Sequence, residues 1–283
     1  MLYGRRGQVM SEKNTVINTP GVVLRTTDVG DRDKMLTVLT PDYGKLSVFA
    51  RGVRKITSGS LPAAQLFAYA RMTLRSGSQY YYLKEAAIEE TFLGISKTIE
   101  GAALASYLCE AADELTVPDL ESKAMMQLVL NTLWTIAGQK RPNDLIKGAF
   151  ELRAAAISGY MPDLTSCCVC GCEECGEHGM LDIMNGRLFC TRCYAEMYAK
   201  TSSRNEAREP LLFRRVNQSA LQAMRYVLYT EAKRQFSFTV EGEGILLFTD
   251  ACETYLLHHV GHGYRTLSYY KSIKEQDTIT CHI

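Results

Sequence analysis

The chain has 283 residues, of which 46% are hydrophobic and 22% are charged, as in an ordinary globular protein. Its first residues, MLYGRRGQVMSEKN, contain no apolar core of signal-peptide length, and no run approaches eighteen consecutive apolar residues. These features argue against a secreted or membrane-spanning protein. They predict a cytoplasmic location, where cysteine thiols stay reduced.

Charge is unevenly distributed along the chain, although the net charge is only +1. Residues 1–85 contain thirteen Lys and Arg but six Asp and Glu, whereas the remainder has nineteen against twenty-five. An asymmetry of this kind indicates that the two parts have different partners. We therefore expect the basic part to be the one that meets phosphate groups.

The first part of the chain has the pattern of a small β-domain. Residues 1–14 are polar and patternless, so we predict a flexible leader there. Turn signals then separate short alternating segments, and Gly44 is suited to a positive φ in the hairpin turn after residue 40. About five antiparallel strands in some 80 residues predict a closed β-barrel, with the OB-fold as a natural candidate. The predicted strands are residues 22–24, 34–40, 46–50, 67–75 and 79–84.

After Gly94 the apolar residues recur with the period of helices. Pro118, Gly159 and Gly261 are predicted stops, whereas Asn143, Asp144 and Ser219 are predicted caps. The predicted helices are residues 99–115, 125–136, 143–159, 219–229 and 245–260, with a last turn in residues 265–273.

Seven of the ten cysteines lie between residues 164 and 193. They include three pairs with two-residue spacing: Cys167/Cys170, Cys172/Cys175 and Cys190/Cys193. Two such pairs complete a tetrahedral sulfur site of the kind that zinc prefers. We favour Cys167, Cys170, Cys190 and Cys193 as ligands, while Cys172/Cys175 with Cys190/Cys193 stays an alternative. Four sulfur ligands leave no position for water, so the predicted Zn²⁺ is structural.

The predicted barrel also carries aromatic and basic residues in alternation between residues 67 and 84, with Arg51, Arg54 and Lys55 nearby. Cations neutralise phosphates and flat rings stack on bases, so this pattern indicates a groove for single-stranded nucleic acid. The alternative is that the rings of Phe67, Tyr69 and residues 80–82 fill the barrel core, because strands are rich in aromatics.

No set of residues assembles an acid, a base and a nucleophile. The chain has no phosphate-binding loop, no dinucleotide fingerprint and no nucleophile elbow. The acidic cluster at residues 28–33 is best explained as a solvated loop, and His258, His259 and His262 as the end of a helix. We therefore predict that the protein is not an enzyme.

With these residues laid out, the chain resembles the RecO family of bacterial DNA repair proteins from about residue 16 to 273. The segment GVVLRTTDVGDRDKMLTVLTPDYGKLSVFARGVRK resembles the opening block of that family, and SYLCEAADELT its helical core. The segment GAFELRAAAISGYMPDLTSCCVCG resembles the family's approach to its zinc site, with Cys190/Cys193 as the second half-site. The most specific matches are Gly159, Tyr160, Pro162, Leu164, Cys167, Cys170 and Gly171. Cys168, Cys172 and Cys175 depart from the family pattern and leave the ligand assignment open.

The resemblance implies an α+β multi-domain protein. It would comprise an OB-fold domain at residues 15–93, a helical domain at 94–163 and 200–283, and an inserted zinc-binding element at 164–199. It also implies a recombination mediator that binds single- and double-stranded DNA, anneals complementary strands and, together with RecR, helps to load RecA. A further implied partner is the acidic C-terminal tail of single-stranded DNA-binding protein. Such a protein is cytoplasmic, and nucleoid-associated when active.

Our main hypothesis is thus a non-enzymatic, DNA-binding mediator with a structural zinc. Two alternatives remain open: a protein-interaction adaptor whose barrel binds no nucleic acid, and a zinc-dependent nucleic-acid hydrolase with an open metal position. The predicted DNA-binding residues are Arg25, Arg32, Lys34, Lys45, Arg51, Arg54, Lys55, Arg71 and Arg75.

Overall fold

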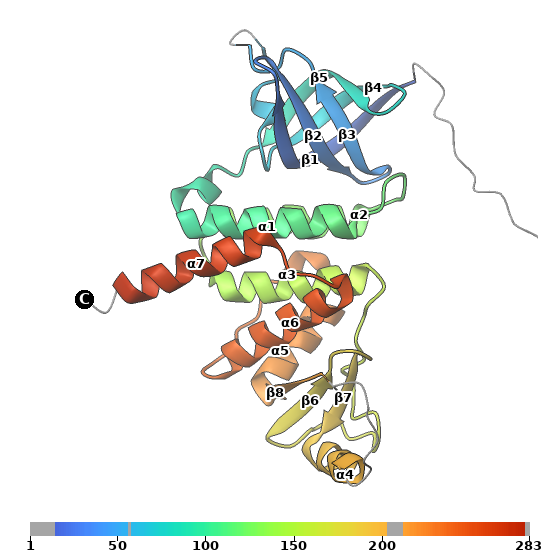
Figure 1. Ribbon diagram of the computed structural model, residues 1–283, viewed down its shortest axis with the longest axis vertical. Coiled ribbons are helices and arrows are strands. Elements are labelled where there is room, and N and C mark those ends of the chain that lie inside the picture. The colour runs from blue at the N-terminus through green and yellow to red at the C-terminus, as the bar shows by residue number, and fades with distance from the viewer. Residues whose placement is uncertain (1–14, 56–57, 203–211, 281–283) are drawn as a thin grey trace, which may run out of the picture. The chain divides into compact units, whose positions relative to one another are not determined.

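The computed structural model describes residues 15–55, 58–202 and 212–280 (Figure 1). The predicted leader at residues 1–14 lies outside the described residues. The chain forms two compact units: residues 1–91 with 116–126, and residues 92–115 with 127–283. We call them the barrel unit and the helical unit. The domain limits given above stay a prediction, and residues 116–126 group with the barrel.

Five strands of the barrel unit close into a barrel in the order β1-β2-β3-β5-β4. Four of the five ladders are antiparallel. The fifth closes the barrel between β3 and β5 and is parallel, with only the pairs Val48–Tyr81 and Phe49–Tyr82. This architecture confirms the predicted OB-like barrel. The strands are β1 Val16–Val29, β2 Asp33–Thr40, β3 Gly44–Ala50, β4 Tyr69–Ser76 and β5 Tyr81–Glu90.

The alternation of side chains fixes which face of each strand is buried. In β4, Ala70, Met72 and Leu74 are fully buried in the barrel core, whereas Arg71 points to solvent. The predicted assignment of faces in this strand is therefore confirmed. Phe67 is an exception, because its φ of 68° places it in the turn before β4 rather than in the strand.

Gly44 does adopt the positive φ expected of the hairpin turn, at 63°. A Cβ at this position would lie 2.3 Å from the carbonyl oxygen of Val117. The segment after residue 115 binds this turn directly, since the Ser122 amide donates to the Pro41 carbonyl at 2.8 Å. Glycine is thus required here both by backbone conformation and by the close approach of a second segment.

The helical unit contains the predicted helices with small shifts at their ends. α3 packs against α6, and α1 packs against α7. The predicted last turn is a full helix, α7. The helices are α1 Ile99–Leu115, α2 Lys123–Gly138, α3 Asn143–Ile157, α4 Thr191–Ser202, α5 Gln218–Tyr229, α6 Gly244–Val260 and α7 Arg265–Thr280; short 3₁₀ turns are η1 Pro62–Ala64, η2 Leu93–Lys97 and η3 Ala232–Arg234.

Two predicted caps are wrong. Asn217, not Ser219, caps α5, because its side-chain oxygen accepts from the Ala220 amide at 2.9 Å. α3 begins after Pro142 with no side-chain cap, so Asn143 and Asp144 are its first helical residues. Gly261 ends α6 as predicted, with a φ of 87°.

The helical unit also contains a three-stranded antiparallel sheet that the sequence did not predict, in the order β7-β6-β8. Its strands are β6 His178–Asp182, β7 Arg187–Cys190 and β8 Phe213–Asn217. β7 runs directly into α4 and β8 directly into α5. The cysteine-rich segment is thereby attached to the helices through continuous secondary structure.

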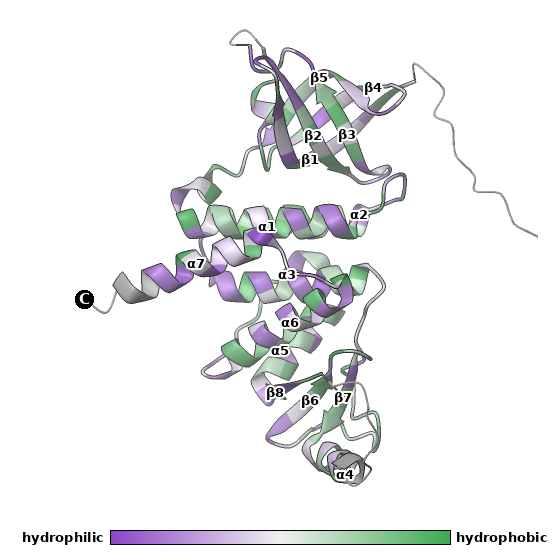
Figure 2. Ribbon diagram, in the orientation of Figure 1, coloured by the Kyte–Doolittle hydropathy of each residue, from purple (hydrophilic) through white to green (hydrophobic). Residues whose placement is uncertain are grey.

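Most elements contain both hydrophobic and hydrophilic residues, as Figure 2 shows for α2 and for the barrel strands. The core of the helical unit is built from large side chains that are essentially inaccessible, including Tyr107, Phe150, Phe248 and Tyr255. Among the described helices, none combines the length and apolar character that a membrane span requires.

Candidate nucleic-acid interface and metal centre

One outward-facing row crosses all five strands of the barrel. Directly paired residues of neighbouring strands project from the same face of a sheet. The pairing therefore sets Thr27 beside Met35, Met35 beside Phe49, Phe49 beside Tyr82, and Tyr82 beside Arg75. We call these five residues the barrel row. The neighbours of Phe49 along β3, Val48 and Ala50, are buried in the core, so Phe49 itself faces outward.

Three rings gather at the middle of the barrel row: Phe49 and Tyr82, which belong to it, and Tyr80, which directly precedes β5. The centroid of Phe49 lies 5.6 Å from that of Tyr80 and 6.1 Å from that of Tyr82. Tyr80 and Tyr82 meet edge to face at 5.2 Å, and the Arg75 guanidinium carbon lies 4.9 Å from the Tyr82 centroid. All three rings are half-buried on the barrel exterior. Of residues 80–82, only Tyr81 packs against the barrel core, whereas Tyr80 and Tyr82 lie on its exterior.

Basic residues collect beside this row, where β3 ends and β2 begins. Two hydrogen bonds bring the turn before β2 to the loop after β3: the Arg54 amide donates to the Arg32 carbonyl at 3.0 Å, and the Gly52 amide donates to Asp33 at 2.6 Å. Arg32, Arg51 and Lys55 are exposed there. Arg51 follows Phe49 by two positions, just beyond the end of β3.

Other predicted cations already have carboxylate partners. Arg71 forms a two-point contact with Glu89, at 2.9 Å and 3.2 Å. Arg54 lies 3.3 Å from Asp28, and Lys34 lies 3.9 Å from the same carboxylate. Arg25 is exposed on β1 opposite Thr37, and Lys45 lies at the opposite end of β3 from Arg51. Among the described residues, exposed Arg51 and Lys55 form no ion pair, whereas Arg54, Lys34 and Arg71 each lie beside a carboxylate.

Four cysteine sulfurs converge in the helical unit. The Sγ atoms of Cys167, Cys170, Cys172 and Cys190 all lie within 4.8 Å of one another. Cys170 Sγ lies 3.4 Å from Cys172 Sγ and 3.8 Å from Cys190 Sγ. A tetrahedron with zinc–sulfur bonds of 2.3 Å has edges of about 3.8 Å. The sulfur atoms are therefore spaced as a single tetrahedral metal position requires, and this cluster could hold a metal ion.

The fold explains how these cysteines meet. Gly171, with a φ of 71°, closes the first turn by donating its amide to the Cys167 carbonyl at 2.9 Å. The Cys167 amide in turn donates to the Cys172 carbonyl at 2.8 Å. Cys190 ends β7, which pairs with β6. Local turn geometry therefore supplies three sulfurs, and a sheet ladder supplies the fourth.

The structure brings together three of the four predicted ligands, with Cys172 in the group of four. Cys193, in the first turn of α4, is buried beside the cluster, and its amide lies 3.5 Å from Cys190 Sγ. Burial, together with hydrogen bonds to Cys170, Cys190 and Cys167, raises the pKa of the Cys193 thiol to about 12. Hydrogen bonds from the backbone and the thiol of Cys172 lower the pKa of Cys170 to about 6, which favours the thiolate. Cys175 is buried outside this group of four, and Cys168 is exposed.

Arg225 on α5 holds the cysteine-rich segment from the helical side. Its guanidinium donates to the carbonyls of Leu164, Thr165 and Glu173, at 2.6, 2.9 and 3.0 Å. These three carbonyls flank the first cysteine turn on both sides. The turn is therefore fixed to α5 by a three-point contact that no sequence pattern predicts.

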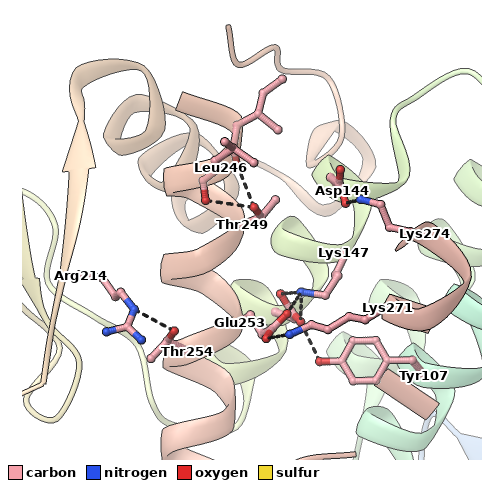
Figure 3. A network of polar contacts seen from close by, with 12 residues as sticks. Tyr107, Asp144, Lys147, Arg214, Leu246, Thr249, Glu253, Thr254, Lys271 and Lys274 are labelled. Carbon is pink, nitrogen blue, oxygen red and sulfur yellow. Dashed lines mark hydrogen bonds and ion pairs between the residues drawn. The ribbon is translucent and has the colours of Figure 1, made fainter. Parts of the chain in front are cut away.

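A second polar centre lies among the helices (Figure 3). Lys147 is only 3% exposed and lies 2.8 Å from Glu151, which is fully buried, and 2.7 Å from Glu253. The Tyr107 hydroxyl donates to Glu151 at 2.7 Å, and Lys271 pairs with Glu253. Burial alone would lower the pKa of Lys147, but the two carboxylates outweigh it and raise that pKa. The lysines and carboxylates of this network pair with one another, which indicates a structural role.

The histidines near the end of α6 serve local contacts. His262 lies 2.6 Å from Glu114, and His259 Nδ1 lies 2.8 Å from the Tyr255 carbonyl. His258 and His262 line a shallow pocket of about 430 Å³ with Arg214, whose guanidinium pairs with Asp250 at 2.8 Å. Within the part of the chain that the structure describes, only the cysteines form a group of three or more potential metal ligands.

Comparison with known proteins matches both units. The N-terminal model of recombination protein O covers residues 10–92, and its C-terminal model covers residues 96–268. The DNA repair protein RecO of Acetivibrio thermocellus is 22% identical over 265 residues, which are 94% of this chain and 99% of that protein. The RecO of Symbiobacterium thermophilum is 28% identical over 242 residues, covering 85% and 90%, and that of Dehalococcoides mccartyi is 30% identical over 175, covering 62% and 69%.

The C-terminal model alone spans more than half of the chain, and the N-terminal model spans the whole barrel. The similar proteins align over most of their own lengths, and they carry one shared name, which refers to DNA repair. The chain therefore belongs to the RecO family of bacterial DNA repair proteins.

Proposed function

We propose that this protein is a non-enzymatic recombination mediator whose barrel binds single-stranded DNA along the barrel row. The observation that carries the proposal is the trio of Phe49, Tyr80 and Tyr82, with the Arg75 guanidinium over the Tyr82 ring and exposed Arg51 two positions after Phe49. Rings stack on bases irrespective of sequence, and cations hold the phosphates between successive bases. Family membership supports the same assignment to DNA repair and recombination.

The wider function follows from this binding mode. Proteins that screen phosphate charge reduce the repulsion between two strands, so we propose that the protein anneals complementary strands and also binds double-stranded DNA. Family membership further supports RecR, RecA loading and the acidic tail of single-stranded DNA-binding protein as functional partners. The site of action is then the cytoplasm, at the nucleoid.

We propose zinc for the cysteine cluster, because an all-sulfur tetrahedral donor set is typical of structural zinc sites. The cluster fits the tetrahedral spacing and contains no carboxylate or imidazole among the described residues. A closed four-sulfur shell contributes folding energy and leaves no position for an attacking water. This argues against the hydrolase alternative.

The test is the triple substitution Arg51→Ala, Arg54→Ala and Lys55→Ala in the full-length protein. Each lost phosphate contact should reduce the slope of log affinity against log salt by about 0.7 for a single strand. We expect the affinity for an unstructured oligonucleotide to fall and the slope to shrink by about 1.4, the share of Arg51 and Lys55, because Arg54 pairs with Asp28. Fluorescence anisotropy between low and moderate salt measures both quantities.

A control variant with the same charge change combines Lys97→Ala, Lys233→Ala and Arg234→Ala in the helical unit, where all three are exposed. It should keep the salt slope of the unchanged protein. Equal slopes for both variants would refute a phosphate-binding barrel face and favour the adaptor alternative.

A further inference from the structure

The first described residue, Thr15, is fixed at one end of the barrel row. Its amide donates to Ser76 Oγ at 3.1 Å, and its carbonyl accepts from the Ser76 amide at 2.8 Å. The next residue, Val16, pairs with Arg75 and is 54% exposed. Directly paired residues share a face of the sheet, so Val16 continues the barrel row beyond Arg75. The chain therefore enters the barrel at the Arg75 end of this row.

The three rings lie close to this point of entry. β1 pairs with β4, and β4 pairs with β5, which carries Tyr82. Tyr80 lies in the loop that joins β4 to β5, directly before the ladder pair of Ser76 and Tyr81. Neighbouring strands are about 4.8 Å apart, so β5 lies about 10 Å from Thr15. The residues that precede Thr15 are thus attached within reach of a nucleotide stacked on these rings.

Residues 1–14 precede Thr15 and lie outside the described residues, but their composition is informative. The segment MLYGRRGQVMSEKN has three cationic side chains against one carboxylate, that of Glu12. The cations are Arg5, Arg6 and Lys13. A basic N-terminal arm is a common means of binding nucleic acid. The composition therefore indicates an anionic ligand.

The segment is long enough to follow a DNA strand past the rings. A chain extends by at most about 3.6 Å per residue, so fourteen residues reach at most about 50 Å. Lys13 is two residues from Thr15 and so stays near Arg75, whereas Arg5 and Arg6 can meet phosphates further along a strand. The N-terminal family model begins at residue 10, so the two arginines are a feature of this chain that the family assignment does not explain.

We propose that residues 1–14 form a basic arm that binds the backbone of single-stranded DNA next to the three rings. The proposal rests on the single-strand site proposed above. The rings hold bases on the barrel, and a strand that passes Arg75 leaves the barrel where the arm begins. Arg5, Arg6 and Lys13 then neutralise the phosphates that follow, which lengthens the binding site beyond the barrel row.

The test is the triple substitution Arg5→Ala, Arg6→Ala and Lys13→Ala in the full-length protein, with a long unstructured oligonucleotide. Each lost phosphate contact reduces the slope of log affinity against log salt by about 0.7, so we expect the slope to shrink by about 2. Fluorescence anisotropy between low and moderate salt gives both the affinity and the slope. The double substitution Arg5→Lys and Arg6→Lys is the matched control, because it keeps the charge, and it should leave the slope unchanged.

The length of the oligonucleotide provides a second measurement. The arm binds phosphates beyond the rings, so its loss should matter less as the strand is shortened to the few nucleotides that the rings hold. The barrel variant, with Arg51→Ala, Arg54→Ala and Lys55→Ala, should instead weaken binding at every length. If the arm variant lost the same affinity at every length, the arm would not extend the site and the proposal would fail.

The two variants separate failure of the arm from failure of the barrel site. An unchanged slope in the arm variant, beside a reduced slope in the barrel variant, would overturn the arm and leave the barrel site intact. A higher affinity of the arm variant would also overturn the proposal, because the arm would then cover the rings instead of extending the site. If neither variant changed the slope, the proposed barrel site would fail together with the arm.

Discussion

Arg51 and Lys55 of the barrel unit are exposed, whereas the helical unit encloses Lys147 and Glu151 among packed helices. On the barrel, Arg51 and Lys55 remain available to an external anion. Among the helices, Lys147 and its two carboxylates satisfy one another, and Tyr107 adds a hydrogen bond. The difference fits the proposed function, in which exposed charge on the barrel binds DNA, while the buried charges between the helices satisfy one another.

The largest expected effect comes from breaking the buried network with Lys147→Met. Glu151, fully buried, would then lose its cationic partner, which typically costs about 3–5 kcal/mol of unfolding free energy. Denaturant unfolding measures this loss. Lys97→Met, at an exposed position, should change stability by less than about 0.5 kcal/mol. If the two variants were equally stable, the buried network would have no structural role. DNA affinity of the folded Lys147→Met protein should be unchanged.

The converse effect, on binding but not on folding, is expected from Tyr82→Leu. Loss of a stacking ring should weaken single-strand binding by about 1–3 kcal/mol per base, while the salt slope stays the same because no charge changes. Anisotropy titrations at several salt concentrations separate the two quantities. Tyr69→Leu, at the other end of β4 from Arg75, is the control and should bind normally. An equal loss in both variants would argue against a localised stacking site.

The smallest effect concerns an exposed pair in the helical unit, His262 and Glu114. The Gly263 carbonyl and then the Glu114 carboxylate raise the pKa of His262 above its usual 6.5. The contribution to stability is therefore complete below about pH 6.5 and is lost as pH rises through the raised value. We expect the stability difference between the unchanged protein and His262→Gln to shrink from pH 5.5 to pH 8.5. Glu114→Gln should weaken that pH dependence without abolishing it, because the Gly263 carbonyl still raises the pKa of His262. A dependence as large as in the unchanged protein would show that Glu114 has no part in it.

Much of the fold follows from local patterns in the sequence. The period-2 alternation of β4 predicts which side chains enter the barrel, and the turn at Gly44 predicts a positive φ. The helical periodicity predicts α1, α2, α3 and α6 to within a few residues. These features depend on neighbours in the chain, so a single sequence contains the information.

The features that the sequence did not predict depend on contacts between segments that are distant in the chain. The alternation along β3 could have identified Phe49 as outward-facing, since Val48 and Ala50 on either side of it face the core. The contact of Phe49 with Tyr82, however, depends on which strands close the barrel. The sheet around the cysteines has strands of only four and five residues, too short for a clear period. The approach of Cys172 to Cys190 likewise depends on that sheet and not on spacing alone.

The parallel closure between β3 and β5 has a consequence for how the barrel responds to a ligand. Only two residue pairs join these strands, so this seam has far fewer ladder hydrogen bonds than the antiparallel ladders and separates at a lower free-energy cost. The contact of Phe49 with Tyr82 supplies side-chain packing across it. A base that inserts between those rings would therefore act on the weakest strand pairing of the barrel. Occupancy of this site by DNA would then be coupled to the stability of the β3–β5 pairing.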